Sequence, residues 1–216
     1  MVKSACALLP MLALCAGCLF SSSAPEVKTW TVAHRMGGSA GGVAKGRARQ
    51  LFDTTRVGPV VVDAPYHRIQ FSLQRADGSV ATDYYNTFVS PPSELLRGAL
   101  RDNLVESGRF GHVVTQGSVA AADAQVEVQV QDLSLRRGGD ASAPLETRVA
   151  LKMDIVRTGR GPRSVMCSLR GDACCEVEAG NYSAAFSKAF NRAVQMALMK
   201  IPDPPRAEAN VGDRGR

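Results

Sequence analysis

The feature that most constrains the fold is a strict alternation of side chains around residue 150. The alternate positions of this run are apolar or Thr: Leu145, Thr147, Val149, Leu151, Met153 and Ile155. The residues between them are mostly charged. Successive side chains of a β-strand point to opposite faces, so the pattern predicts a strand with one apolar and one polar face. Such a strand is typical of an antiparallel sheet that is covered on one side only.

Shorter runs predict the other elements of the fold. Apolar or alternating segments indicate strands at 57–62, 69–74, 80–89, 110–115, 126–130, 164–169 and 175–177, with a short first strand at 30–32. Asp77-Gly78 predicts a tight hairpin turn, because both residue types tolerate a positive φ. Gly171-Asp172 is the corresponding candidate turn between the last two strands.

Two segments have the periodicity of amphipathic helices. In the first, Ser93 is the expected cap, Leu96, Leu100 and Leu104 recur every four residues, and Gly108 ends the helix. The second, at 182–201, has an apolar stripe from Ala185 to Leu198. Two helices and about seven main strands predict an α/β two-layer sandwich, with a mixed, mostly antiparallel sheet and both helices packed on it.

The N-terminal residues have the layout of a secretory signal peptide. Lys3 precedes a short apolar run, and Ala16-Gly17 stand directly before Cys18. This arrangement resembles the lipobox of bacterial lipoproteins, in which the chain is cut before the cysteine and the thiol is acylated. The apolar run is too short to span a bilayer, and Pro10 argues against a core helix. An ordinary secreted protein is the alternative.

These boundaries divide the chain into four parts. Residues 1–17 are the expected lipoprotein signal peptide, 18–29 a Ser-rich tether, 30–201 a single ordered domain and 202–216 a disordered tail. Leu19, rather than Asp, follows the cysteine, and by resemblance to Gram-negative sorting this favours the periplasmic face of the outer membrane. We therefore expect a membrane contact through the lipid anchor at Cys18.

Composition excludes some classes of partner. The chain has 26 Lys and Arg against 20 Asp and Glu, and these basic residues are dispersed. Basic residues interleaved with aromatics, as in nucleic-acid-binding proteins, do not occur, so we expect no nucleic-acid partner. A mild preference for acidic partners or anionic lipid headgroups stays open.

Three cysteines lie in the expected domain: Cys167, Cys174 and Cys175. An exported protein meets an oxidising compartment, so Cys167 is a candidate to form a disulfide with Cys174 or Cys175 across a turn at Gly171-Asp172. A zinc site would need a fourth ligand, and the three histidines are remote in sequence. We expect neither a metal nor another cofactor.

Several ordered motifs together resemble one known family. From Val60 the chain reads Val-Val-Val-Asp-Ala-Pro-Tyr-His-Arg-Ile-Gln-Phe, and the segment from Tyr84 ends in Val89-Ser90-Pro91-Pro92. The first helix is followed by Gly108-Arg109-Phe110, and the last begins Tyr-Ser-Ala-Ala-Phe. With the lipobox, this order resembles the ABC-type transport auxiliary lipoproteins, the group that includes paraquat-inducible protein C. Departures are Phe88, where the family often has Trp, the Gly-rich insertion at 37–49 and the cysteines at 167–175.

The resemblance implies a role in binding rather than catalysis. Members serve envelope lipid-transport systems that contain a mammalian-cell-entry (MCE) domain tunnel protein and an ABC permease, and a homo-oligomeric ring is one arrangement that it implies. The alternative is an envelope lipoprotein for outer-membrane assembly or cell-wall contact.

Enzyme motifs are weak in this sequence. Gly37-Gly38-Ser39-Ala40-Gly41 matches a Gly-x-Ser-x-Gly elbow, but neither flank predicts the required strand or helix. The candidate bases and carboxylates are His67, His112, Asp53, Asp63 and Asp154, none of which has a partner at diagnostic spacing. We expect no enzymatic activity.

Overall fold

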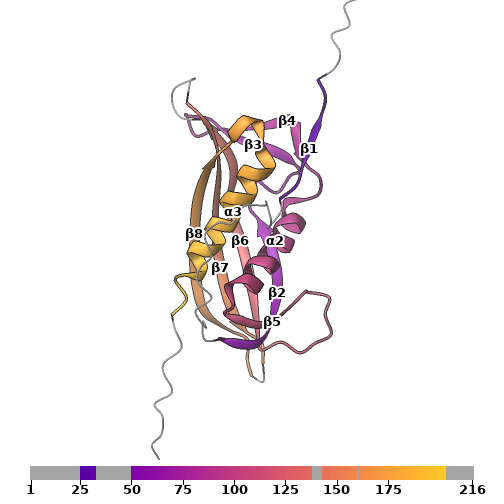
Figure 1. The fold of residues 1–216 in the computed structure, drawn as a ribbon, viewed down its shortest axis with the longest axis vertical. Coiled ribbons are helices and arrows are strands. Elements are labelled where there is room, and N and C mark those ends of the chain that lie inside the picture. Colours follow the sequence, from indigo (N-terminus) through magenta and orange to yellow (C-terminus); the bar gives the residue numbers. More distant parts are fainter. Residues whose placement is uncertain (1–24, 33–49, 138–142, 160, 203–216) are drawn as a thin grey trace, which may run out of the picture.

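One long mixed sheet forms the base of the fold, and two helices lie across the same face of it (Figure 1). The computed structural model describes residues 25–32, 50–137, 143–159 and 161–202. The elements in chain order are β1 (Lys28–Trp30), β2 (Phe52–Val62), β3 (Gln70–Gln74), β4 (Val80–Phe88), α2 (Pro92–Ser107), β5 (Phe110–Val114), β6 (Ala124–Arg137), β7 (Leu145–Arg157), β8 (Ser164–Glu176), the 3₁₀ turn η2 (Glu178–Gly180) and α3 (Tyr182–Leu198).

Strand β6 organises the sheet. Along one side it pairs with β7 over its length, and β7 pairs with the edge strand β8. Along its other side, β2 pairs with the first part of β6 and β3 with the last part, so these two strands share one edge of β6. β5 lies beyond β2, and β4 and then β1 lie beyond β3. The sheet therefore divides into two branches on this side.

The predicted fold class is confirmed. The long β6–β7 and β7–β8 pairings are antiparallel, as is the β3–β4 hairpin, whose turn contains Gly78 at φ +84°. Pairings β1–β4, β2–β5, β2–β6 and β3–β6 are parallel. Most paired residues are antiparallel because the β6–β7 and β7–β8 pairings are the longest ones.

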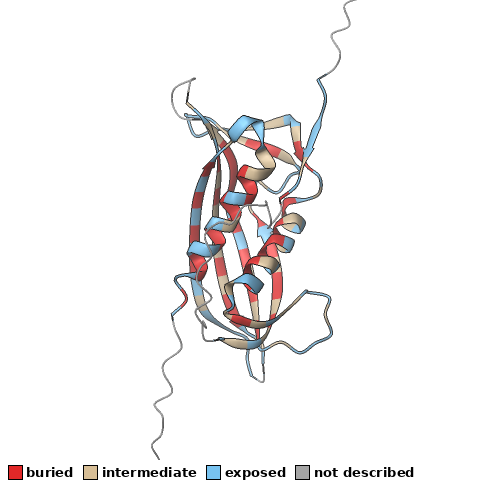
Figure 2. Ribbon diagram, in the orientation of Figure 1, coloured by how far each residue is buried: buried red, intermediate tan, exposed pale blue. Residues whose placement is uncertain are grey.

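The core lies between the sheet and the two helices, as the buried stripes in Figure 2 show. α2 packs on β2 and β5, whereas α3 packs on β7 and β8. The predicted stripe of α2 is confirmed, since Leu96, Leu100 and Leu104 are fully buried. Gly108 ends the helix in the left-handed conformation at φ 64°. Helix α3 buries Phe186, Phe190 and a row of small residues against the sheet.

The predicted start of α2 is wrong by two residues, because the N-cap position is occupied by Pro91 rather than Ser93. The helix begins at Pro92, and no side chain caps it. Proline is well suited to the first helical position, because its fixed φ is helical and its missing N–H would have no partner there. Ser93 therefore lies inside the first turn.

The predicted turn at Gly171-Asp172 is also wrong. Residues 164–176 form one continuous strand, in which Gly171 pairs with Leu151 and Asp172 with Ala150. A Cβ at Gly171 would collide with the backbone carbonyl of Ala193 in α3. Glycine is present here because helix and strand approach each other closely, not because the chain turns.

Candidate docking surfaces

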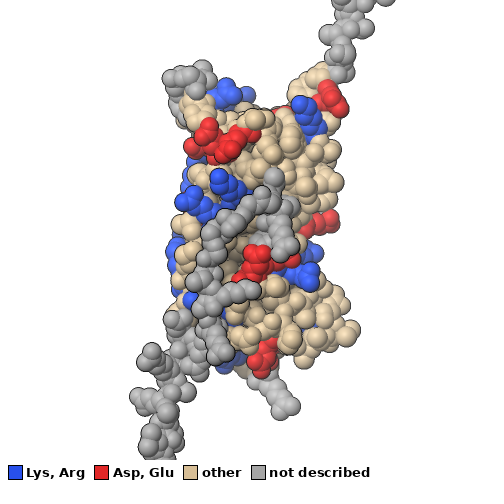
Figure 3. Space-filling model, viewed as in Figure 1, with Lys and Arg blue, Asp and Glu red and all other residues tan. Residues whose placement is uncertain are grey.

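The helices leave the second face of the sheet uncovered, and we call its part on β6, β7 and β8 the polar face. Its residues alternate with core residues: Asp132 and Arg148 flank the buried Leu133 and Val149 along their strands. The helix side, seen in Figure 3, has Lys and Arg interspersed with Asp and Glu over its described part. Neither arrangement concentrates one sign of charge in the manner of a nucleic-acid interface.

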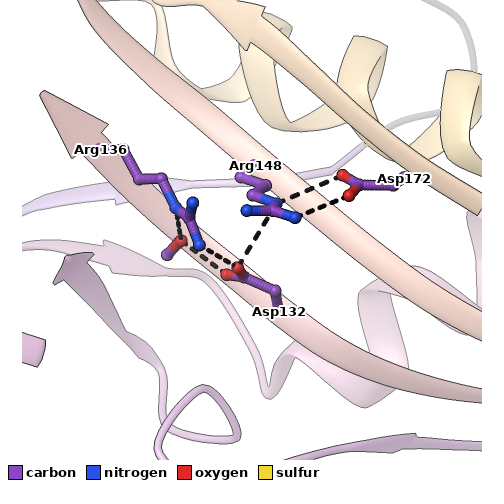
Figure 4. A network of polar contacts seen from close by, with 5 residues as sticks. Asp132, Arg136, Arg148 and Asp172 are labelled. Atoms are coloured by element: carbon purple, nitrogen blue, oxygen red, sulfur yellow. Dashed lines mark hydrogen bonds and ion pairs between the residues drawn. The ribbon is translucent and has the colours of Figure 1, made fainter. Parts of the chain in front are cut away.

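An ion-pair network crosses all three strands of the polar face (Figure 4). The Asp132 carboxylate accepts from Arg136 at 2.6 Å and from the Ser134 hydroxyl at 2.6 Å. Arg148 Nε lies 3.7 Å from the same carboxylate, and its Nη2 donates to Asp172 at 2.7 Å. Contact with Asp172 raises the pKa of Arg148, so the guanidinium stays charged. Each charge is thus partnered within the network.

Tyr66, in the loop between β2 and β3, lies close enough to the network to feel its charges. Burial, followed by the negative charge of Asp132, raises the pKa of the Tyr66 phenol. The phenol is therefore neutral at physiological pH and lies within electrostatic reach of Asp132. Because Asp132 is only 8% exposed, this carboxylate is a structural charge rather than an open binding group.

An open depression of about 230 Å³ lies further along the same side of the sheet. Pro59, Val61, Glu127, Val128, Gln129 and Asp154 line it. Glu127 and Asp154 face each other across β6 and β7, which would be repulsive if both were unpaired. Arg163 pairs with Glu127, and Lys152 pairs with Asp154 at 2.9 Å. The two carboxylates are therefore neutralised locally.

The residues considered for catalysis do not form one site among the described residues. His67 lies in the β2–β3 loop, His112 on β5 and Asp53 at the start of β2, all exposed. The Asp63 carboxylate accepts from Gln129 at 2.9 Å, and Asp154 is paired as described above. No group of three metal-binding side chains occurs in the described part of the chain. Ser39 and Cys18 lie outside the described residues.

A second surface is formed where the N-terminal strand joins the sheet, and we call residues 25–32 and 80–89 the β1–β4 edge. The Trp30 Nε1–H donates to Asn86 Oδ1 at 3.0 Å. The ring centroids of Trp30 and Tyr182 lie 5.2 Å apart in an edge-on contact. The Ser183 hydroxyl donates to the carbonyl of Thr31 at 2.6 Å. These contacts fasten β1 to both β4 and α3.

The rings at this edge continue into the core. The ring centroid of Phe71 lies 4.6 Å from that of Phe88 and 5.1 Å from that of Phe186. The first pair is tilted and the second is edge-on, which are arrangements that aromatic pairs favour. Phe88 is 3% exposed. The position where the family often has Trp is therefore occupied by a smaller ring in a closed cluster.

The β1–β4 edge also contains a bulge on β4. Gln70 pairs with Thr87 and the next residue, Phe71, pairs with Asp83, so the three residues between them on β4 have no partner on β3. Asp83 Oδ1 accepts from the backbone N–H of Tyr85 at 2.9 Å and of Asn86 at 3.2 Å. Tyr84 is 68% and Tyr85 52% exposed as a result.

The three cysteines of the domain are free in this structure. Cys167 and Cys174 lie seven positions apart on one strand, so they cannot meet without the turn that is absent. Cys175 is buried on the helix side, and Cys174 is exposed on the polar face. Loss of contact with water is the largest cause of the raised pKa of each thiol, even at the more exposed Cys174, and it favours the protonated form.

Sequence reasoning missed both the network and the bulge. The strand predicted at 126–130 stopped short of Asp132, Ser134 and Arg136, and the partners of these residues on β7 and β8 depend on register. The exposed tyrosines follow from hydrogen bonds of Asp83, which no sequence pattern considered above identifies.

Several solved structures have a similar fold. Protein XCC0632 from Xanthomonas campestris, described as a DUF330 protein, aligns with a TM-score of 0.58 at 11% identity, over 81% of this chain and 92% of that one. An uncharacterized protein aligns with a TM-score of 0.55 at 15% identity, over 81% and 96%. At these identities the likeness establishes the fold alone.

A weaker likeness is to PelC of Paraburkholderia phytofirmans, solved as a dodecamer, with a TM-score of 0.42 and 12% identity over 69% of this chain and 91% of that one. No curated protein matches the chain in sequence. Within the described residues, no helix combines the length and apolarity required to cross a bilayer.

Residues 39–196 match the family described as the ABC-type transport auxiliary lipoprotein component, and this range is most of the chain. The chain therefore belongs to the ABC-type transport auxiliary lipoprotein family.

Proposed function

We propose that the protein is an outer-membrane lipoprotein that docks an MCE-domain tunnel protein of an ABC-type lipid-transport system and acts without catalysis. The observation that supports this most is the family match over residues 39–196, combined with the Ala16-Gly17-Cys18 motif.

The anchor is tested first. Cys18→Ser should yield an unprocessed precursor that takes up no labelled fatty acid. Labelling equal to wild type would show that Cys18 is not the acylated residue. Leu19→Asp, which keeps the cysteine, should remain acylated but move to the inner-membrane fraction, whereas an unchanged location would contradict outer-membrane sorting.

Partner binding is tested separately. Cross-linking in intact envelopes followed by purification of this protein should recover an MCE-domain protein, together with its ABC permease in larger complexes. Native mass measurement of the purified lipoprotein shows whether it assembles as a ring. Recovery of outer-membrane assembly factors or peptidoglycan, without an MCE-domain protein, would instead support the alternative role.

A further inference from the structure

Two aromatic side chains at the β1–β4 edge have no role in the core. Tyr84 and Tyr85 are the adjacent bulge residues described above, and more than half of each is exposed. Large apolar side chains exposed next to each other in sequence mark contact sites more often than they serve stability. The rings therefore indicate a contact surface.

The bulge that exposes the tyrosines is held by hydrogen bonds of Asp83 and Asn86. Asp83 accepts from two backbone N–H groups, and its other oxygen accepts from Asn86 Nδ2 at 2.8 Å. Asn86 in turn accepts from Trp30 Nε1, which connects the bulge to β1. A bulge of this type directs side chains away from the sheet, and here its frame is fixed to the N-terminal strand.

The direction of β1 decides what lies beyond this surface. β1 runs parallel to β4, with Lys28 opposite Asn86 and Trp30 opposite Phe88. Followed toward the N-terminus, the chain leaves the β1–β4 ladder at Lys28, on the side of Asn86 where Tyr85 and Tyr84 precede it, and the half-exposed Val27 precedes Lys28. Figure 1 shows β1 and β4 together at one end of the long axis.

Tether length limits which end of the domain can face a membrane. From Cys18 to Pro25 there are seven chain steps, which span at most about 25 Å. The 14 residues of β6 make the sheet roughly 45 Å long. A chain of this reach cannot run back along the domain, so the β1–β4 edge is the end that is nearest to the anchor.

We infer that Tyr84 and Tyr85 insert at the boundary between headgroups and acyl chains of the bilayer that holds Cys18. The inference rests on the proposed lipid anchor. Tyrosine suits this boundary because its ring is apolar and its hydroxyl stays hydrated, which explains the aromatic belts of membrane proteins. With an acylated anchor already present, the contact serves to orient the domain rather than to retain it.

An oriented domain would present its far end to the periplasm. That end comprises β5, the 115–123 loop and the turn between β7 and β8, which lie opposite β1 and β4 (Figure 1). A fixed orientation raises the effective concentration of this end toward a partner that approaches from the periplasm.

The test uses the full acylated protein in vesicles of phosphatidylethanolamine and phosphatidylglycerol whose acyl chains are brominated near the headgroup. Bromine quenches only nearby tryptophan. Trp30 is the single native tryptophan, so its emission is measured in wild type and subtracted. Tyr84→Trp and Tyr85→Trp report on the bulge, and Val119→Trp, at a fully exposed position of the 115–123 loop, is the matched control.

We expect emission to be lost at positions 84 and 85 and retained at 119. Retained emission at 84 and 85 would overturn the contact, and so would equal losses at all three positions, which would mean no fixed orientation. Flotation with the vesicles and the mass of the acylated N-terminus report on the anchor independently. Protein that floats and is acylated but unquenched therefore refutes only the bilayer contact, whereas protein without acyl groups refutes the anchor and the contact together.

Discussion

Strand pairing is long and regular across β6, β7 and β8 but short and irregular at the β1–β4 edge. β6 pairs with β7 from Ala124 to Arg137, with one register shift, between Val130 and Asp132. β1 contributes three residues, and its partner β4 contains the bulge of Tyr84, Tyr85 and Asn86. In the first region a long backbone ladder holds the strands, whereas in the second the short ladder of β1 is supplemented by side-chain hydrogen bonds of Trp30 and Ser183.

The two regions also differ in whether their exposed side chains have partners within the protein. The charges of the polar face are partnered either within one strand, as in Asp132 with Arg136, or across neighbouring strands, as in Arg148 with Asp172. The exposed rings of the β1–β4 edge are not covered by any of the described residues in this way. A surface whose charges are paired within the protein contributes to stability. An exposed aromatic surface instead favours contact with a partner molecule or a membrane.

The largest effect is expected where α3 touches β8. Gly171→Ala should destabilise the protein by more than about 4 kcal/mol, because the new Cβ meets backbone rather than a movable side chain. Gly98→Ala is the matched control, since open space surrounds that helical glycine, and it should stabilise by about 0.5–1 kcal/mol. Urea unfolding measures both changes. Equal effects would contradict close packing of α3 on β8.

Leu100→Ala should have the next largest effect. Its side chain is fully buried in the centre of α2, and truncation of such a leucine destabilises proteins by roughly 2–5 kcal/mol. Val105→Ala on the exposed side of the same helix should change the free energy of unfolding by less than about 0.5 kcal/mol. A small effect of Leu100→Ala would mean that the α2 stripe is not part of the core.

Much of the regular region could be predicted from sequence, and the reason is periodicity. The alternation from Leu145 to Ile155 predicted β7 correctly, and the Leu96, Leu100 and Leu104 stripe predicted α2. Gly171 misled the prediction because a glycine required for close packing has the same sequence appearance as a turn glycine. The disulfide expected for Cys167 depended on that turn, so the error in local structure extended to the cysteines.

The candidate surfaces were less predictable, because they depend on long-range register. Asp132 and Asp172 are far apart in sequence and meet only through Arg148 on the intervening strand. The bulge requires the offset of Gln70 and Phe71 against β4, which local residue preferences do not determine. Periodicity identifies a face of an element, but not which other element's residues lie beside it.

Trp30→Ala should affect the β1–β4 edge selectively. It removes the hydrogen bond to Asn86 and the edge-on contact with Tyr182, a loss of about 1–2 kcal/mol. Hydrogen exchange should accelerate at the amides of β1 and the bulge, with protection of β6 and β7 retained. Trp30→Phe, which keeps a ring, should show a smaller change. Uniform acceleration over the whole sheet would contradict the separation of the two regions.

The smallest effect is expected at Asp154, beside the depression. Burial alone would raise the pKa of this carboxyl, but polar contacts with Ser168 and Lys152 outweigh burial and lower it from 3.8. A lowered pKa in the folded state means that the ionised carboxylate stabilises the protein above about pH 4 and that this contribution is lost as the pH falls through the folded-state value. Asp154→Asn should therefore weaken the fall of the free energy of unfolding at acid pH. Lys152→Gln should make that fall begin at a higher pH. Superimposable curves for wild type and Asp154→Asn between about pH 2 and 5 would show that the pairing on this face contributes nothing to acid stability.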